Sequence, residues 1–256
     1  WRWASLNGKN TQRLDKVLSH MGYGTRSELK RYIRLGMVEV NGVTVKDGGM
    51  QVDPYDDEIT VGGERVRFRE YVYLMLNKPK GVVSATEDAR DRTVIDLLAD
   101  EYRHFAPFPV GRLDKDTEGL LLLTNDGKLA HRLLSPRKHV PKTYVAEVEG
   151  DVDEQDRRMF AEGVTLDDGY VTMPAKLDIL DRDVRDGRII SRVELTIVEG
   201  KFHQVKRMFK AVGKRVVSLR RTAMGPLKLD ETLAPGEYRE LSEQEQSALA
   251  TFGTGE

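Results

Sequence analysis

The strongest constraint on the fold of this 256-residue chain is a charged segment that runs directly into an apolar one. Residues 112–118 hold three acids and two bases, and leucine occupies all four positions from 120 to 123. A short apolar run without alternation is typical of a strand covered on both faces. We therefore expect a sheet with at least one buried strand. The charged segment is then either an exposed turn with local ion pairs or a site.

Strand and helix patterns continue along residues 72–245. Apolar residues alternate over 72–76, 142–149 and 191–198, which predicts strands, and helical spacing appears over 93–102, 126–134 and 202–212. One face of the last helix is expected to hold Phe202, Val205, Met208, Phe209 and Val212. These patterns favour an α+β domain with a mixed, largely antiparallel central sheet flanked by helices.

Residues 12–71 predict a separate small domain of two helices and a hairpin. Thr25 and Glu28 have the spacing of a capping box, Gly36 is placed to end the second helix, and Asn41-Gly42 is a strong hairpin signal. The second helix carries a basic stripe formed by Arg26, Lys30, Arg31 and Arg34. We divide the chain into a tail (1–11), this small domain (12–71), a larger domain (72–245) and a C-terminal tail (246–256).

The net charge of −1 conceals a segregation of charge along the chain. Residues 196–221 hold eight lysines and arginines against one acid, whereas residues 226–256 hold two against seven. A local positive field suits a nucleic-acid partner, although an ordinary solvated surface also produces such a pattern.

Several kinds of site are disfavoured by composition and spacing. The chain has no cysteine, which excludes disulfides and thiolate metal ligands and is typical of the reducing cytoplasm. The five histidines show no zinc-binding pair, and Asn125 stands where a calcium loop beginning at Asp114 needs a bidentate glutamate. No membrane-length apolar run and no glycine-rich nucleotide loop is present. We expect no metal, no cofactor and no membrane partner.

The front domain resembles the small αL-type RNA-binding module of a small-subunit ribosomal protein, which also precedes many RNA-modifying enzymes. The similarity lies in RLDKVLS, TRSELKRYIRLGMVEVNG and the hairpin. It implies that the basic stripe contacts RNA; the alternative is an ordinary polar face.

The larger domain resembles the pseudouridine synthases. Its segment GRLDKDTEGLLLLTNDG is similar to their signature, and LNKPKG, KTY and EGKFHQVKRMFKAVG match three further motifs in the family's order. The resemblance implies that Asp114 is the essential catalytic acid, that Tyr144 stacks on a flipped uracil, and that Lys201 is the cation that keeps Asp114 ionised. The reaction isomerises a uridine of RNA and needs no cofactor.

The same resemblance implies roles in binding RNA. Arg112 would occupy the space left by the flipped uridine, and Gln204 would support the loop or touch RNA. Lys206 and Arg207 would contact phosphates, together with other cations of their segment.

The stretches HQVKRMF, SPRKHVPKTY and LAPGEYREL resemble the branch that acts on 16S rRNA, whose target in the family is uridine 516. We therefore expect a monomeric cytoplasmic enzyme whose partner is 16S rRNA or the immature small ribosomal subunit. Two alternatives stay open. The first alternative is a 23S rRNA enzyme of the same superfamily, and the second is a non-catalytic ribosome assembly factor that binds rRNA.

Overall fold

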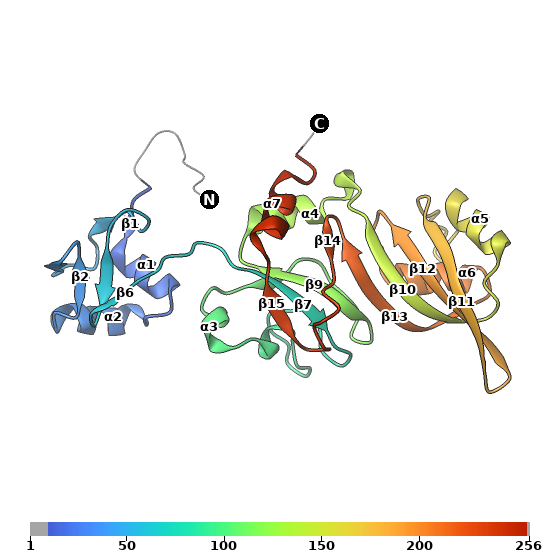
Figure 1. Cartoon of the computed structure of the whole chain (residues 1–256), viewed down its shortest axis with the longest axis horizontal. Coiled ribbons are helices and arrows are strands. Elements are labelled where there is room, and N and C mark those ends of the chain that lie inside the picture. Colours follow the sequence, from blue (N-terminus) through green and yellow to red (C-terminus); the bar gives the residue numbers. More distant parts are fainter. Residues whose placement is uncertain (1–9, 255–256) are drawn as a thin grey trace. The chain divides into compact units, whose positions relative to one another are not determined.

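The computed structural model describes residues 10–254, so the tail expected at residues 1–11 lies almost wholly outside it. The chain forms two compact units (Figure 1). One unit takes the chain up to Tyr71 together with Ala99–Ala106, and the other takes Val72–Leu98 and the chain from Pro107 onward. No helix among residues 10–254 is long and apolar enough to cross a membrane.

The first unit contains two helices and short strands around a small core. Its elements are β1 (Gln12–Arg13), α1 (Leu14–His20), α2 (Arg26–Arg34), β2 (Val38–Val40), β3 (Val43–Thr44), β4 (Gln51–Val52), β5 (Ile59–Val61), β6 (Glu64–Arg65) and α3 (Asp100–Arg103). Strand β1 pairs with β4, and the other four strands form a sheet in the order β3-β2-β5-β6. The buried faces of α1 and α2 pack in one cluster with residues of the sheet.

Local sequence signals explain how this unit is built. The side chain of Thr25 accepts a hydrogen bond from the backbone of Glu28 at 3.3 Å, and the Glu28 carboxylate accepts one from the backbone of Thr25 at 2.7 Å. This capping box begins α2 as predicted. Asn41 and Gly42 both have positive φ, 51° and 76°, which is the conformation of a two-residue hairpin turn.

The second unit is built around one large sheet. Its strands are β7 (Tyr73–Lys78), β8 (Phe108–Pro109), β9 (Glu118–Thr124), β10 (Lys142–Glu149), β11 (Lys176–Arg185), β12 (Arg188–Ile197), β13 (Arg215–Met224), β14 (Leu227–Lys228) and β15 (Tyr238–Glu240). The main order is β11-β12-β10-β13-β9-β7-β15, with β14 beside β13 and β8 beside β9. Every pairing between these named strands is antiparallel except β13 with β9, so the predicted mixed, largely antiparallel sheet is confirmed.

The single parallel pairing between named strands depends on a glycine. Gly119 of β9 lies opposite Arg221 of β13 and has φ +107°. A Cβ atom at this position would lie 2.2 Å from the Arg221 carbonyl oxygen, so only glycine allows the two strands to approach this closely. The loop that carries Asp114 ends directly before this junction.

Helices cover the sheet (Figure 1). They are α4 (Gly127–Leu134), α5 (Glu154–Glu162), α6 (Gln204–Ala211) and α7 (Glu243–Thr251), with 3-10 turns at Ile95–Leu97 and Pro136–Lys138. Helices α4 and α7 share an apolar cluster with β7, β9 and β14, whereas α5 packs on β11 and α6 packs on β13. The leucines at 120–123 are fully buried, as expected for a strand covered on both faces.

Two expectations need correction here. Residues 246–256 are not simply a tail, because α7 continues to Thr251 and buries Leu249 in the core. The helical pattern over 93–102 forms two short turns rather than one helix, since Leu98 and Ala99 are extended where the chain passes from one unit into the other.

Candidate active site

A buried lysine anchors the loop that carries Asp114. Lys78, the last residue of β7, is fully buried, and its Nζ donates hydrogen bonds to the carbonyl oxygens of Pro79, Lys115 and Thr117 at 2.9, 3.3 and 2.9 Å. Burial lowers the pKa of Lys78 to about 8, against the opposing effect of the loop's carboxylates. One charged donor therefore ties the loop to the strand at two of its carbonyls.

A second set of hydrogen bonds fixes the same loop from the segment that follows β7. Ser84 Oγ donates to the Leu113 carbonyl at 3.0 Å and accepts from the Leu113 N–H at 3.1 Å. The N–H of Gly81 donates to the Lys115 carbonyl at 2.9 Å. Residues 78–84 thus form the scaffold of the loop, which gives LNKPKG a structural purpose.

The carboxylate of Asp114 lies between the side chains of Lys206 and His203. Lys206 Nζ, in the first turn of α6, is 3.1 Å from Asp114 Oδ2 and 2.7 Å from Asp116 Oδ1. His203 Nε2 is 3.4 Å from the other Asp114 oxygen. Burial lowers the pKa of Lys206, but its bonds to the two carboxylates outweigh burial and raise that pKa overall. Lys206 therefore stays protonated at neutral pH and pairs with Asp114 as a cation.

The ion pair expected between Lys201 and Asp114 is not formed. Lys201 Nζ instead lies 4.5 Å from the centre of the Tyr170 ring, while Lys206 holds the acid. The reason is geometric, because Lys201 precedes the left-handed turn at His203 (φ 48°) and Lys206 follows it on the helix. Lys206, which was expected only to contact phosphate, forms the ion pair with Asp114 that was expected of Lys201.

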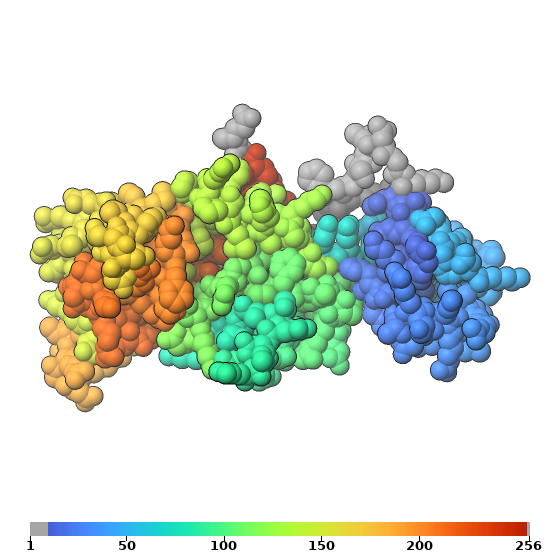
Figure 2. Space-filling view, turned by 180° about the vertical axis from the view of Figure 1, so that it is seen from behind, coloured from blue at the N-terminus to red at the C-terminus, as the bar shows by residue number. Residues whose placement is uncertain are grey.

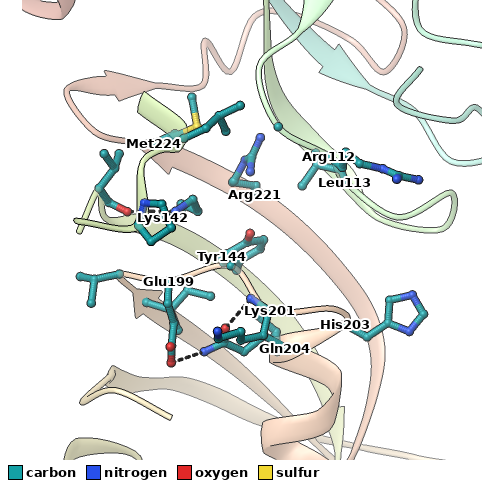
Figure 3. A pocket seen from close by; sticks show the side chains of 18 of the residues that line it. Arg112, Leu113, Lys142, Tyr144, Glu199, Lys201, His203, Gln204, Arg221 and Met224 are labelled. Atoms are coloured by element: carbon teal, nitrogen blue, oxygen red, sulfur yellow. Dashed lines mark hydrogen bonds between the residues drawn. The ribbon is translucent and has the colours of Figure 1, made fainter. Parts of the chain in front are cut away.

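Tyr144 and Arg221 line the pocket and lie near one another (Figure 3). Tyr144 is 8 % exposed on β10, where a register shift between Thr143 and Tyr144 interrupts the pairing with β13. Irregularities of this kind re-aim side chains next to sites. Arg221 is 2 % exposed, and its Nε donates to the Leu120 carbonyl at 2.9 Å.

Gln204 builds the far side of the site rather than pointing freely into it. The side chain is 4 % exposed; its Oε1 accepts from the Lys201 N–H at 2.9 Å and its Nε2 donates to Glu199 Oε1 at 2.8 Å (Figure 3). Glu199 also accepts from the Tyr170 hydroxyl at 2.6 Å and the Met173 N–H at 2.8 Å. This network fixes the turn that leads into α6.

The remaining predicted residues fall into two groups. Arg112, which is exposed, lines the pocket. Asp114, Tyr144, Lys201 and Gln204 line it as well. Arg207 does not present a free charge, because its Nη2 lies 2.7 Å from both Asp167 and Asp168 and these bonds raise its pKa. The four basic residues of α2 are exposed on the first unit.

The pocket lined by Arg112, Asp114, Tyr144, Lys201 and Gln204 has a volume of about 480 Å³. In Figure 2 a recess lies between the green surface and the orange surface of the second unit, which are the chain regions that line it. The volume is within the range of small-molecule sites. Among residues 10–254, no cluster of three or more histidines and acids is arranged to hold a metal ion.

The sequence prediction missed several residues that the structure places at this site. They are Lys78, Lys142, Tyr170, Glu199 and His203. Arg221, one of the further cations expected to contact phosphates, is instead buried and lines the pocket. Burial, followed by the charge of Arg221, lowers the pKa of Lys142. Lys78, Lys142, Glu199 and His203 lie inside motifs that had been recognised, so those motifs were the available signal.

The chain is similar to known proteins along almost its whole length. A family model described as RNA pseudouridylate synthase matches residues 72–211, and one described as the S4 domain matches residues 12–59. A crystal structure of a pseudouridylate synthase has 41% sequence identity and a TM-score of 0.64, with 93% of this chain and 99% of that chain covered.

Of three curated relatives, one has a name without a ribosomal subunit, one is named for the small subunit and one for the large subunit. An uncharacterized RNA pseudouridine synthase of Bacillus subtilis is 55% identical, covering 93% of this chain and 98% of the relative. A ribosomal small subunit pseudouridine synthase A of Escherichia coli is 41% identical, covering 93% and 99%. A ribosomal large subunit pseudouridine synthase B of Bacillus subtilis is 40% identical, covering 93% and 95%.

Proposed function

Because this chain belongs to the RNA pseudouridylate synthase family, we propose that Asp114 is its catalytic carboxylate and that its substrate is a uridine of 16S rRNA. The family membership makes the chain an RNA uridine-to-pseudouridine isomerase with an S4 domain in front. The catalytic residue and the RNA target are the proposal.

The observation that carries the proposal is the position of the Asp114 carboxylate. It is at the pocket, on a loop that Lys78 and Ser84 hold in place, with Lys206 3.1 Å away. A catalytic group needs this kind of fixed orientation. A protein that only bound RNA would gain nothing from a carboxylate placed where phosphates approach.

The reaction breaks the bond between ribose C1′ and uracil N1 and forms a bond between C1′ and C5. The C5 proton leaves and N1 gains a proton, so substrate and product have the same composition and no oxidant or reductant is needed. The ionised Asp114 either adds covalently to the sugar or base or removes a proton from the sugar. Each route requires an ionised oxygen facing the nucleotide, which Lys206 stabilises.

The neighbouring residues have complementary roles in the proposal. Tyr144 offers its ring to the extruded uracil. Arg112 is exposed beside the acid, and in the proposal it occupies the space that the uridine leaves in the RNA stack. Lys201 and Gln204 act on the opposite side, where Gln204 holds the turn and Lys201 lies over Tyr170.

The choice of 16S rRNA rests on the form of three segments, HQVKRMF, SPRKHVPKTY and LAPGEYREL. Identity to the named relatives does not favour either ribosomal subunit, because the values of 41% and 40% are almost equal. By resemblance to the family, we also propose that the enzyme acts as a monomer.

The experiment is a conversion assay without added cofactor. Purified protein is incubated with 16S transcript, 23S transcript and immature small subunits, and modified sites are mapped by sequencing. The proposal predicts one new pseudouridine in 16S rRNA, at uridine 516 by family resemblance. A site confined to 23S rRNA would overturn the target, and no site in either rRNA would overturn the function.

A further inference from the structure

Phe202 exposes an aromatic ring next to the active site. Its side chain is 76% exposed, more than any other large apolar side chain among residues 10–254. Helical spacing predicted that it would be buried on α6, but the helix begins only at Gln204, so the ring points away from the core. A single exposed apolar residue is common on protein surfaces, and what sets Phe202 apart is the set of residues around it.

The ring is held in one orientation. It stacks on the imidazole of His203, with ring centres 3.8 Å apart and planes 19° from parallel. His203 has the left-handed φ of 48°, which a non-glycine residue keeps only where its surroundings impose it. Arg207, fixed by Asp167 and Asp168, donates from Nη1 to the Phe202 carbonyl at 3.1 Å.

The stacked pair lies between the acid and a basic surface. His203 Nε2 is 3.4 Å from Asp114, so the pair begins at the pocket itself. Phe202 and His203 also line an adjoining hollow of about 530 Å³. Its other lining residues are Lys206, Lys210 and the ion-paired Arg207, Asp167 and Asp168. Lys210 is exposed on the next turn of α6 after Lys206. An aromatic face with lysines beside it suits a base and its phosphate.

We propose that Phe202, backed by His203, is the stacking platform for the base of a nucleotide adjacent to the target uridine. The free face of the ring receives the base, and the exposed Lys210 receives its phosphate. This inference rests on the proposed function, which places the target uridine in the neighbouring pocket. It assigns Phe202 to substrate binding and not to the chemical step.

The test combines variants of Phe202 with changes in the RNA. Phe202→Ala and Phe202→Leu remove the aromatic face, Phe202→Tyr keeps it, and Val184→Ala is the control, since Val184 is 67% exposed on β11 and lines neither hollow. The substrate is an rRNA fragment that the wild type converts, with the base deleted from either nucleotide beside the target.

The platform predicts a rise in KM of about ten-fold for Phe202→Ala and Phe202→Leu, with kcat at saturating RNA within a few-fold of wild type. Phe202→Tyr and Val184→Ala should match wild type. Deleting one of the two flanking bases should cost the wild type a similar factor and cost Phe202→Ala nothing further. If Phe202→Leu matches wild type, or if the two losses multiply, the platform is refuted.

A binding measurement separates this inference from the proposed function. Affinity for oligouridylate needs no turnover, and it should fall about ten-fold in Phe202→Ala relative to Phe202→Tyr. If the wild type binds RNA but converts no uridine, the proposed function fails, and this comparison still decides for or against the platform. Thermal unfolding shows whether Phe202→Ala is misfolded. If it is, the RNA affinities of Phe202→Leu and Phe202→Tyr are compared instead.

Discussion

Helices α2 and α6 carry basic residues of the same kinds, but their surroundings differ. On α2, Arg26, Lys30, Arg31 and Arg34 are exposed on the surface of the small unit. On α6, Lys206 lies against Asp114 and Asp116, and Arg207 lies against Asp167 and Asp168. The acids that engage α6 come from segments distant in sequence, 90 residues away for Asp116 and 40 for Asp167.

The difference shows that basic residues on a helix can hold acids of their own chain in place instead of contacting RNA. The cations of α2 are available for phosphates, whereas Lys206 and Arg207 already serve the site and the turn before α6. The sequence pattern predicted RNA contact for all six residues, the four on α2 and the two on α6. Substitutions on and around the two helices test whether α2 contacts RNA while Lys206 and Arg207 of α6 hold acids of their own chain.

The largest effect is expected at the acid that α6 holds. Asp114→Asn should lower the single-turnover rate by at least about 1000-fold, because it removes the proposed reacting group, while RNA affinity changes only a few-fold. Asp116→Asn is the matched control, since Asp116 also bonds to Lys206 but its side chain is 72% exposed. Similar losses in both variants would show that the charge cluster matters as a whole and that Asp114 has no special role.

The next effect concerns the anchor of the acid loop. Lys78→Met should lower the single-turnover rate about 100-fold, because a small displacement of a catalytic group has an effect of that size. Lys80→Met is the control within the same motif, because Lys80 is half exposed. Its Nζ is 4.0 Å from Glu118 Oε2, which is long for an ion pair. The anchoring role is contradicted if the two variants have equal rates and equal thermal stability.

The titration of Lys78 gives a pH dependence with opposite signs for activity and stability. Its pKa is about 8 in the folded protein against an ordinary value of 10.5. Activity should fall above pH 8 as the anchor loses its proton. Between pH 8 and 10.5 the unfolded chain binds more protons, so this group's contribution to the free energy of unfolding rises with pH. Comparing both profiles with those of Lys78→Met isolates the effect of the lysine.

A smaller effect is expected from the exposed cations of α2. Replacing all four by glutamine should weaken rRNA binding about ten-fold and reduce its salt dependence, with the rate at saturating RNA unchanged. Arg157→Gln is the control, because Arg157 is exposed on α5 but paired with Glu154 and Asp178. An unchanged salt dependence in the fourfold variant would remove the contrast between the helices.

The sequence predicted elements whose signals are local. The Thr25 capping box, the Asn41-Gly42 turn and the buried strand after the charged segment all formed as expected. A capping box at Ser242 and Glu245 was equally visible, and using it would have placed α7 instead of a tail.

The site was less predictable because its contacts join distant segments. Lys206 reaches Asp114 across 92 residues, and Lys78 reaches the Thr117 carbonyl across 39. Phe202 shows the limit of periodicity, since its spacing fits α6 but the turn at His203 precedes the helix. Side-chain partners of this kind depend on tertiary packing, which no local pattern records.

The most direct test of the account compares Lys206→Met with Lys30→Met in single-turnover reactions at saturating enzyme, alongside equilibrium binding of the same rRNA. We predict that Lys206→Met lowers the rate constant about 100-fold with little change in affinity, since it removes the cation beside the partly buried Asp114. Lys30→Met should leave the rate constant unchanged and weaken affinity slightly. If Lys206→Met alters only affinity, Lys206 is a phosphate contact like Lys30, and the account of the site is wrong.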